Sequence, residues 1–318
     1  MNINRIQDIR PEFPDTPVTV KRCGNVVEVR YIASNTPAIA IEKLTADLYA
    51  DKRTGEVKEF QHHDSRAADK ASVAQSLRKL RDLINANLEN PETALWVTLT
   101  YQENMTDPAQ LYEDYRRFWQ RFKYYLRKRG RPPAEYIIAA EPQARGAWHL
   151  HCLFLFPDKA PFIRNSDIAQ IWGHGFTKTQ NLRGIGNPGL YLTAYLGNME
   201  LTEAVNAGAF QAKRLAGSKD KSKAIIKGAR LNLYPPGFNL YRFSRGIKRP
   251  EIWQTTEQEA QAEITGMPLT YEKTISITDE GGTIRNIINY RTYTKPPAES
   301  DPTTTNKTTN AETSRETN

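Results

Sequence analysis

The chain has 318 residues, with 44 Lys and Arg against 36 Asp and Glu, which gives a formal net charge of +8. This basic balance favours an anionic partner, and nucleic acid is the first candidate. The two cysteines, Cys23 and Cys152, are too few for a disulfide framework, and no apolar stretch resembles a signal peptide or a membrane span. We therefore expect a cytoplasmic protein that does not enter a membrane.

The first 64 residues are expected to form a largely irregular N-terminal extension with one clear strand, residues 25–31. Apolar residues then recur every three or four positions from about residue 65 to residue 88, which predicts a helix. Asn90-Pro91 ends it. Residues 94–101 are rich in β-branched and aromatic side chains and predict a buried strand.

A second helix is predicted to begin at Asp107-Pro108, where an N-cap residue precedes a proline. Its polar side is basic, and no acid occurs between residues 116 and 131. A charge run is often only a solvated face, but the lack of acids here favours contacts to backbone phosphates. The residues expected to make these contacts are Arg116, Arg117, Arg121 and Lys123.

The segment Trp148–His149–Leu150–His151 opens a strand that continues through an apolar run to Phe156. Side chains alternate across a strand, so His149 and His151 lie on one face. Two imidazoles placed in this way can bind one divalent metal ion. The same alternation also arises by chance in amphipathic strands, so the pair alone does not decide the matter.

The strand before it, residues 136–141, ends in Glu141 ahead of a turn. If the two strands form a hairpin, a register that places Glu141 near His149 brings the carboxylate to the histidine face. Two histidines and one carboxylate make a three-ligand set with open positions for a substrate oxygen. The alternative for Glu141 is a solvated acid at a strand end.

A short helix capped by Ser166 and a short strand, residues 176–179, are expected next. Asn187-Pro188 then opens a helix on which Tyr191 and Tyr195 lie one turn apart on the same face. A tyrosine pair at this spacing is usually packed into a core. A phenol becomes a nucleophile when a cation stabilises its anion or the phosphate that it attacks, and a divalent metal with nearby Lys or Arg could supply that.

A second basic stretch runs from residue 213 to residue 230 and leads into residues 241–250, where basic and aromatic residues alternate. This composition suits single-stranded nucleic acid, because bases stack on the rings and phosphates pair with the cations. A surface hairpin corner would look similar. The residues assigned to DNA binding here are Lys213, Arg214, Lys227 and Arg245.

Residues 270–295 alternate around residues 279–282 and predict a terminal β-hairpin. From residue 296 the chain has almost no apolar content, so we expect a disordered tail. The expected organisation, in chain order, is an N-terminal extension (1–64), a central domain (65–255), a C-terminal hairpin (256–295) and a tail (296–318).

In order and spacing, three segments resemble the motifs of the HUH endonucleases, in particular rolling-circle replication initiators similar to filamentous-phage gene II product. Residues 96–101 resemble the first motif, a strand of the catalytic sheet. Glu141 with residues 148–151 resembles the second, the metal site, and residues 191–195 resemble the third, the nucleophile helix. The resemblance covers roughly residues 70–250.

One departure concerns the third motif, which in the family usually has a lysine three residues after a catalytic tyrosine. Ala194 and Asn198 stand at those positions here. The supporting role of the lysine must be absent or supplied from elsewhere, for example from the basic stretch after residue 213. The choice between the two tyrosines stays open; we favour Tyr195, because the lysine most often follows the second tyrosine of a pair.

The resemblance implies an α+β fold of the ferredoxin-like or RRM-like type, an antiparallel sheet of about five strands with helices on one side. It also implies a metal-dependent endonuclease and strand transferase that nicks single-stranded or extruded origin DNA of a plasmid or phage through a 5′-phosphotyrosine. Its metal, Mg²⁺ or Mn²⁺, is expected at His149, His151 and Glu141.

No G-x-x-x-x-G-K-[ST] phosphate loop occurs in the sequence, so unwinding is expected to depend on a host helicase, with the host replication machinery as a further partner. The main alternative is a conjugative relaxase or a single-strand transposase of the same type. A different class also fits the basic patches, namely a catalytically silent origin-binding protein.

Overall fold

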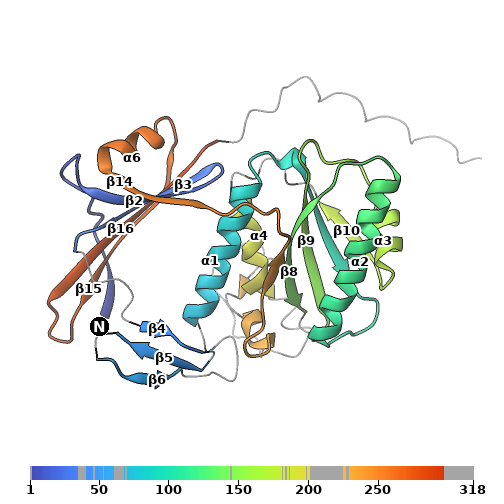
Figure 1. Ribbon diagram of the computed structural model, residues 1–318, viewed down its shortest axis with the longest axis horizontal. Coiled ribbons are helices and arrows are strands. Elements are labelled where there is room, and N and C mark those ends of the chain that lie inside the picture. Colours follow the sequence, from blue (N-terminus) through green and yellow to red (C-terminus); the bar gives the residue numbers. More distant parts are fainter. Residues whose placement is uncertain are drawn as a thin grey trace, which may run out of the picture.

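The computed structural model describes residues 2–34, 41–45, 47–52, 54–60, 68, 70–143, 145–180, 182, 185, 187–197, 199–200, 225–226 and 229–296. Two large antiparallel sheets, one of five strands and one of six, lie on either side of helix α1 (Lys70–Asn87) (Figure 1). The α+β class built on antiparallel sheets is therefore confirmed.

The five-stranded sheet carries the two histidines. Its strand order is β10-β7-β9-β8-β13, and all neighbours are antiparallel. The strands are β7 (Ala94–Thr100), β8 (Glu135–Pro142), β9 (Trp148–Leu155), β10 (Thr177–Gln180) and β13 (Tyr241–Phe243). The four strands predicted between residues 94 and 179 are thus present. Strand β9 is central, which explains its apolar run, because both of its faces are covered.

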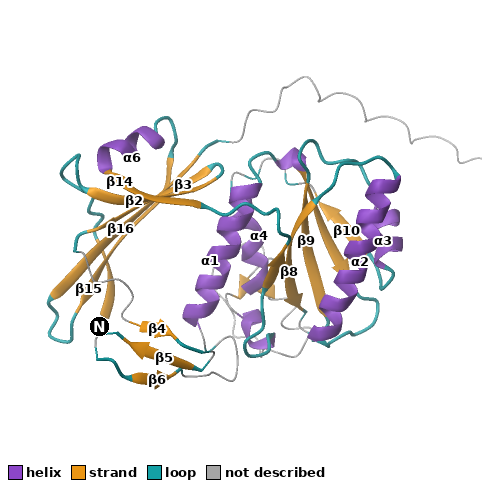
Figure 2. Ribbon diagram, in the orientation of Figure 1, coloured by secondary structure: helices purple, strands orange, loops and turns teal. Residues whose placement is uncertain are grey.

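Helices cover this sheet on both faces (Figure 2). On one face lie α2 (Pro108–Lys128) and α3 (Asn165–Trp172), and Phe122 of α2 packs on Phe154 of β9 with the ring centroids 4.7 Å apart. On the other face, which carries the histidines, lie α1 and α4 (Pro188–Gly197). The expectation of helices on one side therefore describes only α2 and α3.

Local capping signals account for the helix starts. Asp107 Oδ1 accepts a hydrogen bond of 2.8 Å from the Ala109 amide, and Pro108 occupies the first helical position, as predicted. The prediction that Ser166 caps α3 is wrong, because the N-cap lies two residues earlier, at Arg164, whose side chain makes no capping bond. Asn187 Oδ1 accepts from the Leu190 amide at 2.9 Å and so caps α4.

Helices α1 and α4 approach each other closely at Gly189. Its amide donates to Asn85 Oδ1 over 2.8 Å, and a Cβ atom at this position would lie 2.4 Å from the Arg81 carbonyl oxygen. Asn85 Nδ2 also donates to Asn187 Oδ1 over 3.0 Å, so one buried amide side chain on α1 holds the first turn of α4. Only glycine allows this separation of the two backbones.

The six-stranded sheet combines the two ends of the chain in the order β1-β15-β16-β3-β2-β14. Its strands are β1 (Asn2–Ile6), β2 (Pro17–Cys23), β3 (Val26–Ile32), β14 (Glu251–Thr256), β15 (Leu269–Thr278) and β16 (Ile284–Thr294). Helix α6 (Glu257–Glu263) packs on β2 and β14. The predicted hairpin at residues 270–295 is confirmed by the pairing of β15 with β16.

The N-terminal region contains more strands than the sequence pattern predicts. Besides β3, which the pattern does predict, it contributes β1 and β2 to the large sheet, so the expectation of a mostly irregular segment is wrong. A small three-stranded sheet follows, with β4 (Ile41–Lys43), β5 (Leu48–Asp51) and β6 (Val57–Glu59). The shorter remaining elements are η1 (Pro91–Thr93), β11 (Met199–Glu200), β12 (Ile225–Ile226) and η3 (Ala229–Leu233).

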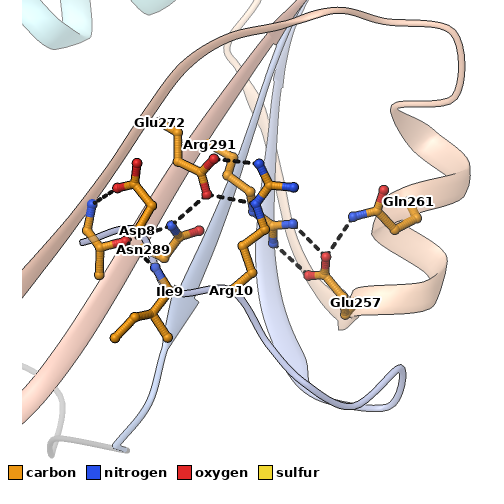
Figure 3. A network of polar contacts seen from close by, with 9 residues as sticks. Asp8, Ile9, Arg10, Glu257, Gln261, Glu272, Asn289 and Arg291 are labelled. Atoms are coloured by element: carbon orange, nitrogen blue, oxygen red, sulfur yellow. Dashed lines mark hydrogen bonds and ion pairs between the residues drawn. The ribbon is translucent and has the colours of Figure 1, made fainter. Parts of the chain in front are cut away.

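Polar contacts inside the six-stranded sheet tie distant segments together (Figure 3). The fully buried guanidinium of Arg291 on β16 donates to both oxygens of Glu257 on α6, at 2.5 and 2.6 Å. Arg10 donates to both oxygens of Glu272 on β15, at 2.8 and 2.5 Å. The segment after β1 and the start of α6 are therefore both fixed to the C-terminal hairpin.

Two of the contacts between this sheet and the segment around α1 come from β2 and the turn after it. Lys21 Nζ on β2 lies 2.8 Å from Asp82 Oδ2 on α1. Asn25 Nδ2 donates to the Glu89 carbonyl over 2.8 Å. Across the residues that the structure describes, no helix is both long and apolar enough to cross a membrane.

Candidate functional site

The pairing of β8 with β9 sets the geometry of the candidate site. Glu141 lies directly opposite His149, as the predicted register requires. On the other side of β9, Thr100 lies opposite His149 and Thr98 lies opposite His151. The carboxylate and both imidazoles therefore belong to the same face of the sheet, the face covered by α1 and α4.

His151 is held in one orientation by three neighbours. Its ring stacks on Trp96, with the centroids 5.2 Å apart and an interplanar angle of 13°. Its Nδ1 lies 3.3 Å from Thr98 Oγ1, and its Nε2 contacts Glu141 Oε2 directly. The imidazole is thus fixed with Nε2 turned to the carboxylate.

Glu141 is buried and has a second charged partner, Arg230. The guanidinium Nη2 lies 3.0 Å from Glu141 Oε1, and Nη1 donates to the Pro142 carbonyl over 2.8 Å. Burial alone would raise the pKa of Glu141, but His151 and Arg230 reverse this and hold it below its usual range. The carboxylate is therefore ionised at neutral pH.

His149 has a different environment. Burial, opposed by the nearby Glu141 carboxylate, lowers the pKa of His149 to about 4, so the imidazole is neutral at neutral pH. Its Nε2 is buried and has no hydrogen-bond partner within the described part of the chain. A buried polar atom left without a partner is costly, and a neutral imidazole nitrogen is a metal ligand.

The donor types fit a divalent metal ion: two imidazoles and an ionised carboxylate from adjacent strand positions. Among the described residues, however, no three His, Cys, Asp or Glu side chains are grouped so that they could hold an ion. Glu141 Oε2 contacts His151 instead of sharing a point with both histidines. Metal binding at this place requires that contact to open.

Helix α4 carries both predicted tyrosines over the histidine face. Leu192 and Leu196 are buried against β8 and β9, and Tyr191 is 39% exposed. Tyr195 belongs to the helix, while its side chain lies outside the described part. The sequence spacing therefore gives a helix as predicted.

The Tyr234 hydroxyl connects α4 to the strand end that carries Glu141. This hydroxyl lies 2.8 Å from the Ala140 carbonyl oxygen and 3.0 Å from the Leu196 carbonyl oxygen. It is buried, and its single proton can be donated to either carbonyl oxygen. The last turn of α4, which includes Tyr195, is thereby held beside the residue that precedes Glu141.

Sequence reasoning missed the part played by the η3 segment, which supplies Arg230 and, at its end, Tyr234. In the sequence Arg230 is only the last member of a basic stretch, where a buried arginine cannot be told from a solvated one. Tyr234 stands before Pro235-Pro236 in a stretch without periodicity. Neither residue carries a local pattern that indicates its contacts.

The basic face of α2 is less uniform than its sequence indicates. Glu113, one turn before the basic run, lies 2.7 Å from Arg116 and 3.2 Å from Arg117. Arg121 Nη1 donates to the Ile171 carbonyl at the end of α3 over 3.2 Å. Lys123 lies over the Trp119 ring, 5.8 Å from its centroid. The four basic residues predicted to contact phosphates all belong to α2, which covers the sheet face opposite the histidines.

Of the other residues assigned to DNA binding, the structure describes only one. Arg245 is exposed in the turn after β13. Lys213, Arg214 and Lys227 lie outside the described residues. The structure therefore brings Glu141, His149, His151 and the tyrosine helix together, and it places the α2 residues elsewhere.

The structure therefore contains an antiparallel sheet with two histidines and a carboxylate on one face, and a tyrosine-bearing helix packed over that face. In agreement, residues 94–200, about a third of the chain, match the family model of the replication-associated proteins of the ORF2 and phage gene II product type. The matched segment runs from β7 through α4 and includes all five residues of the candidate site that the sequence singled out.

The match confirms the resemblance to replication initiators of the phage gene II product type and supports a replication-associated, DNA-binding protein. Neither the comparison with curated proteins nor the comparison with solved structures found a match.

Proposed function

We propose that this protein initiates rolling-circle replication by nicking and rejoining single-stranded origin DNA through a tyrosine-linked intermediate. The observation that carries the proposal is the matched segment itself, which holds His149, His151 and Glu141 on one sheet face under the helix of Tyr191 and Tyr195. The plasmid or phage that encodes such an initiator would provide the origin, and host helicase and replication proteins would extend the freed strand.

In this proposal His149, His151 and Glu141 hold Mg²⁺ or Mn²⁺. When bound, such an ion polarises a phosphate oxygen and stabilises the charge that develops in the transition state. His149 is already neutral and has a buried, unpartnered nitrogen among the described residues, which favours the role of ligand. Glu141 is already ionised.

The proposed nucleophile is a tyrosine hydroxyl. Its oxygen forms a bond to the scissile phosphorus while the bond from phosphorus to the 3′-oxygen breaks. The phenol gives up its proton, the leaving 3′-oxygen gains one, and the 5′-phosphate remains on the tyrosine. We favour Tyr195, because Tyr234 holds the last turn of α4 beside Ala140. The second tyrosine would then serve the later transfer that rejoins the DNA.

Arg230 is a positioning residue in this scheme. Its guanidinium forms an ion pair with Glu141 Oε1 and donates to the Pro142 carbonyl. The other oxygen of Glu141, Oε2, is left on the side of the histidines. Partners behind a metal ligand orient it and tune its basicity. Arg230 comes from the end of the basic stretch 213–230, and it compensates for the missing family lysine by supplying positive charge to the same site.

The remaining basic residues are proposed to bind DNA phosphates. Arg245 is exposed, which suits this role. Lys213, Arg214 and Lys227 are proposed for it from their charge alone. For Arg116, Arg117 and Arg121 the proposal is weaker, because each already has a partner on α2 or α3.

The experiment incubates the full-length protein with Mn²⁺ and a pooled library of single-stranded oligonucleotides, and then looks for a covalent adduct that survives denaturation. Sequencing the attached DNA identifies the cleavage site even when the origin sequence is unknown. We expect an adduct with the wild type, none with Tyr191→Phe/Tyr195→Phe, and an unchanged yield with the matched control Tyr271→Phe on β15. An adduct formed by the double variant contradicts the mechanism, and DNA binding without any adduct supports the silent origin-binding alternative.

A further inference from the structure

A groove with a volume of about 700 Å³ lies at the C-terminal end of α2. Its floor includes Leu126 and Ala134, which are buried. Three basic side chains, Lys123, Arg127 and Arg131, line it together with Tyr124, whose side chain is 54% exposed. None of the described residues that line it is acidic. The groove thus combines an exposed aromatic ring with three basic side chains and has no acid among its described lining residues.

The three cations of the groove differ from Arg116 and Arg117, which have an acidic partner. Within the described part of the chain, no carboxylate lies at ion-pair distance from Lys123, Arg127 or Arg131, whereas Glu113 pairs with Arg116 and Arg117. The guanidinium carbon of Arg127 lies 5.7 Å from the Tyr124 ring centroid. Arg127 is therefore the groove cation beside the Tyr124 ring, while the Lys123 ammonium lies over Trp119, 5.8 Å from its centroid.

The groove is remote from the candidate cleavage site. It belongs to α2, on the sheet face opposite the histidines. It also adjoins the start of β8, where Ala134 precedes Glu135, while Glu141 stands at the other end of that strand. Six residues of extended chain span about 20 Å. Nucleotides of DNA bound in the groove are therefore not the nucleotides that lie at Tyr191 and Tyr195.

We propose that this groove is a second binding site for single-stranded DNA, in which one base stacks on Tyr124 and the adjoining phosphates pair with Lys123, Arg127 and Arg131. Aromatic faces beside a basic track are the means by which proteins bind single strands without reading their sequence. The choice of DNA among anionic polymers rests on the proposed function. Such a site would retain a DNA segment on the far side of the sheet from the cleavage site.

The test measures the binding of a short fluorescein-labelled oligothymidylate to the full-length protein by anisotropy over a range of salt concentrations. All proteins carry Tyr191→Phe/Tyr195→Phe, so that covalent capture does not contribute. The variants are Tyr124→Ala, Tyr124→Phe, and the pair Arg127→Gln/Arg131→Gln. The control is Arg30→Gln/Arg285→Gln, which removes the same charge from two exposed positions of the six-stranded sheet.

Tyr124→Ala should weaken binding about tenfold, since stacking of one base contributes on that order, and Tyr124→Phe should stay close to the parent protein. Arg127→Gln/Arg131→Gln should lower the salt slope by about 1.4, because each phosphate contact to a single strand contributes roughly 0.7. The Arg30/Arg285 control should change the slope less. Photocrosslinking with 5-bromodeoxyuridine should label the peptide that contains Tyr124.

The inference is overturned if Tyr124→Ala binds like Tyr124→Phe, or if the control pair loses as much as the groove pair. It is also overturned if polyglutamate binding depends on Tyr124 and oligonucleotide binding does not, which would indicate an acidic protein as the ligand. Its failure is distinguishable from failure of the nicking proposal. If the protein with both tyrosines intact forms no adduct but Tyr124-dependent binding persists, the groove stands and the nicking proposal falls.

Discussion

At the scale of single residues, the candidate site depends on how one carboxylate is shared. Glu141 contacts His151 through one oxygen and Arg230 through the other, while His149 has a buried nitrogen without a partner in the described structure. The two histidines are therefore not equivalent, although the sequence presents them as a symmetric pair. His151 is a structural partner of Glu141 as well as a proposed ligand, whereas His149 has no such contact with the carboxylate.

This difference predicts unequal costs of substitution. His149→Ala should lower the free energy of unfolding less than His151→Ala does, because no hydrogen bond of Nε2 is lost. His151→Ala should destabilise by about 1–3 kcal/mol, because it leaves the buried Glu141 oxygen without its partner. Both variants should lose Mn²⁺ binding. Urea unfolding and Mn²⁺ titration measure the two effects separately. Equal stability losses would contradict the assignment.

Arg230 permits a test of positioning that is independent of folding. Arg230→Gln should weaken Mn²⁺ affinity about 10- to 100-fold, because the orientation of Glu141 is lost. Arg230→Lys should restore part of this affinity, since the charge remains while the bond to Pro142 is lost. Isothermal titration with Mn²⁺ gives the affinities and urea unfolding gives the stability. If Arg230→Gln changes only stability, Arg230 has a structural role alone.

At the scale of elements, the position of α4 follows from backbone contacts at both of its ends. Gly189 and Asn85 fix its first turn on α1, and the Tyr234 hydroxyl fixes its last turn near β8. The helix and its tyrosines are recognisable from sequence, whereas these anchors are not.

Gly189→Ala should separate α1 from α4, because the added Cβ would lie 2.4 Å from the Arg81 carbonyl oxygen, which belongs to a helix backbone and cannot move freely. We expect a loss of about 1–3 kcal/mol in the free energy of unfolding, as is typical of overpacking, together with a reduced yield of DNA adduct. Gly281→Ala is the control, since only the Asp279 side chain lies within reach, at 3.5 Å. A variant as stable as this control would show that the helices can adjust.

The pair formed by Glu257 and Arg291 predicts a pH dependence of stability. Burial alone would raise the pKa of Glu257, but Arg291 and Gln261 hold it below its usual range. A carboxyl group whose pKa is lower in the folded state stabilises the fold above its unfolded-state pKa of about 4.3, and this stabilisation is lost as the pH falls through the folded-state value.

Glu257→Gln should therefore be less stable than wild type at pH 7, and the difference should shrink at a pH well below 4. Urea unfolding of both proteins at several pH values measures this. Glu280→Gln, an exposed change in the turn after β15, controls for the loss of a negative charge. A difference between wild type and Glu257→Gln that is constant with pH would contradict the ion pair.

At the scale of the whole molecule, the two ends of the chain form one sheet. Strand β3 pairs with β16, and β1 pairs with β15, across more than two hundred residues of intervening sequence. The five-stranded sheet with the candidate site lies between these two halves along the chain. The matched residues 94–200 are thus flanked in the sequence, on both sides, by strands of a second sheet that the match does not cover.

A chain ending at residue 255 should test this arrangement. Without β16, strand β3 loses one of its two neighbours, and without α6 strand β2 loses its covering helix. Hydrogen–deuterium exchange should show loss of protection in β2 and β3, while β7 and β9 keep theirs. Adding a peptide of residues 256–296 should restore protection. Strands β2 and β3 that stay protected in the shortened chain would contradict the prediction.

The sequence by itself determined the features that depend on near neighbours. The alternation in β9, the Asp107-Pro108 start of α2 and the spacing of Tyr191 and Tyr195 each predict an element that the structure contains. The register of Glu141 with His149 was expected only if the two strands formed a hairpin, and the structure contains that pairing. The ion pairs of Glu113 with Arg116 and Arg117 are also local to one helix, at spacings of three and four residues, but we had expected these arginines to contact phosphates.

Tertiary structure alone decided which distant segments meet. The pairing of β1 and β3 with the C-terminal hairpin, the second pair of helices on the histidine face, and the burial of Arg230 against Glu141 all join residues far apart in the chain. Local periodicity records which face of an element is apolar, but not which element will cover it. That choice depends on the packing of the complete core, because loop closure over long separations costs little more than over short ones.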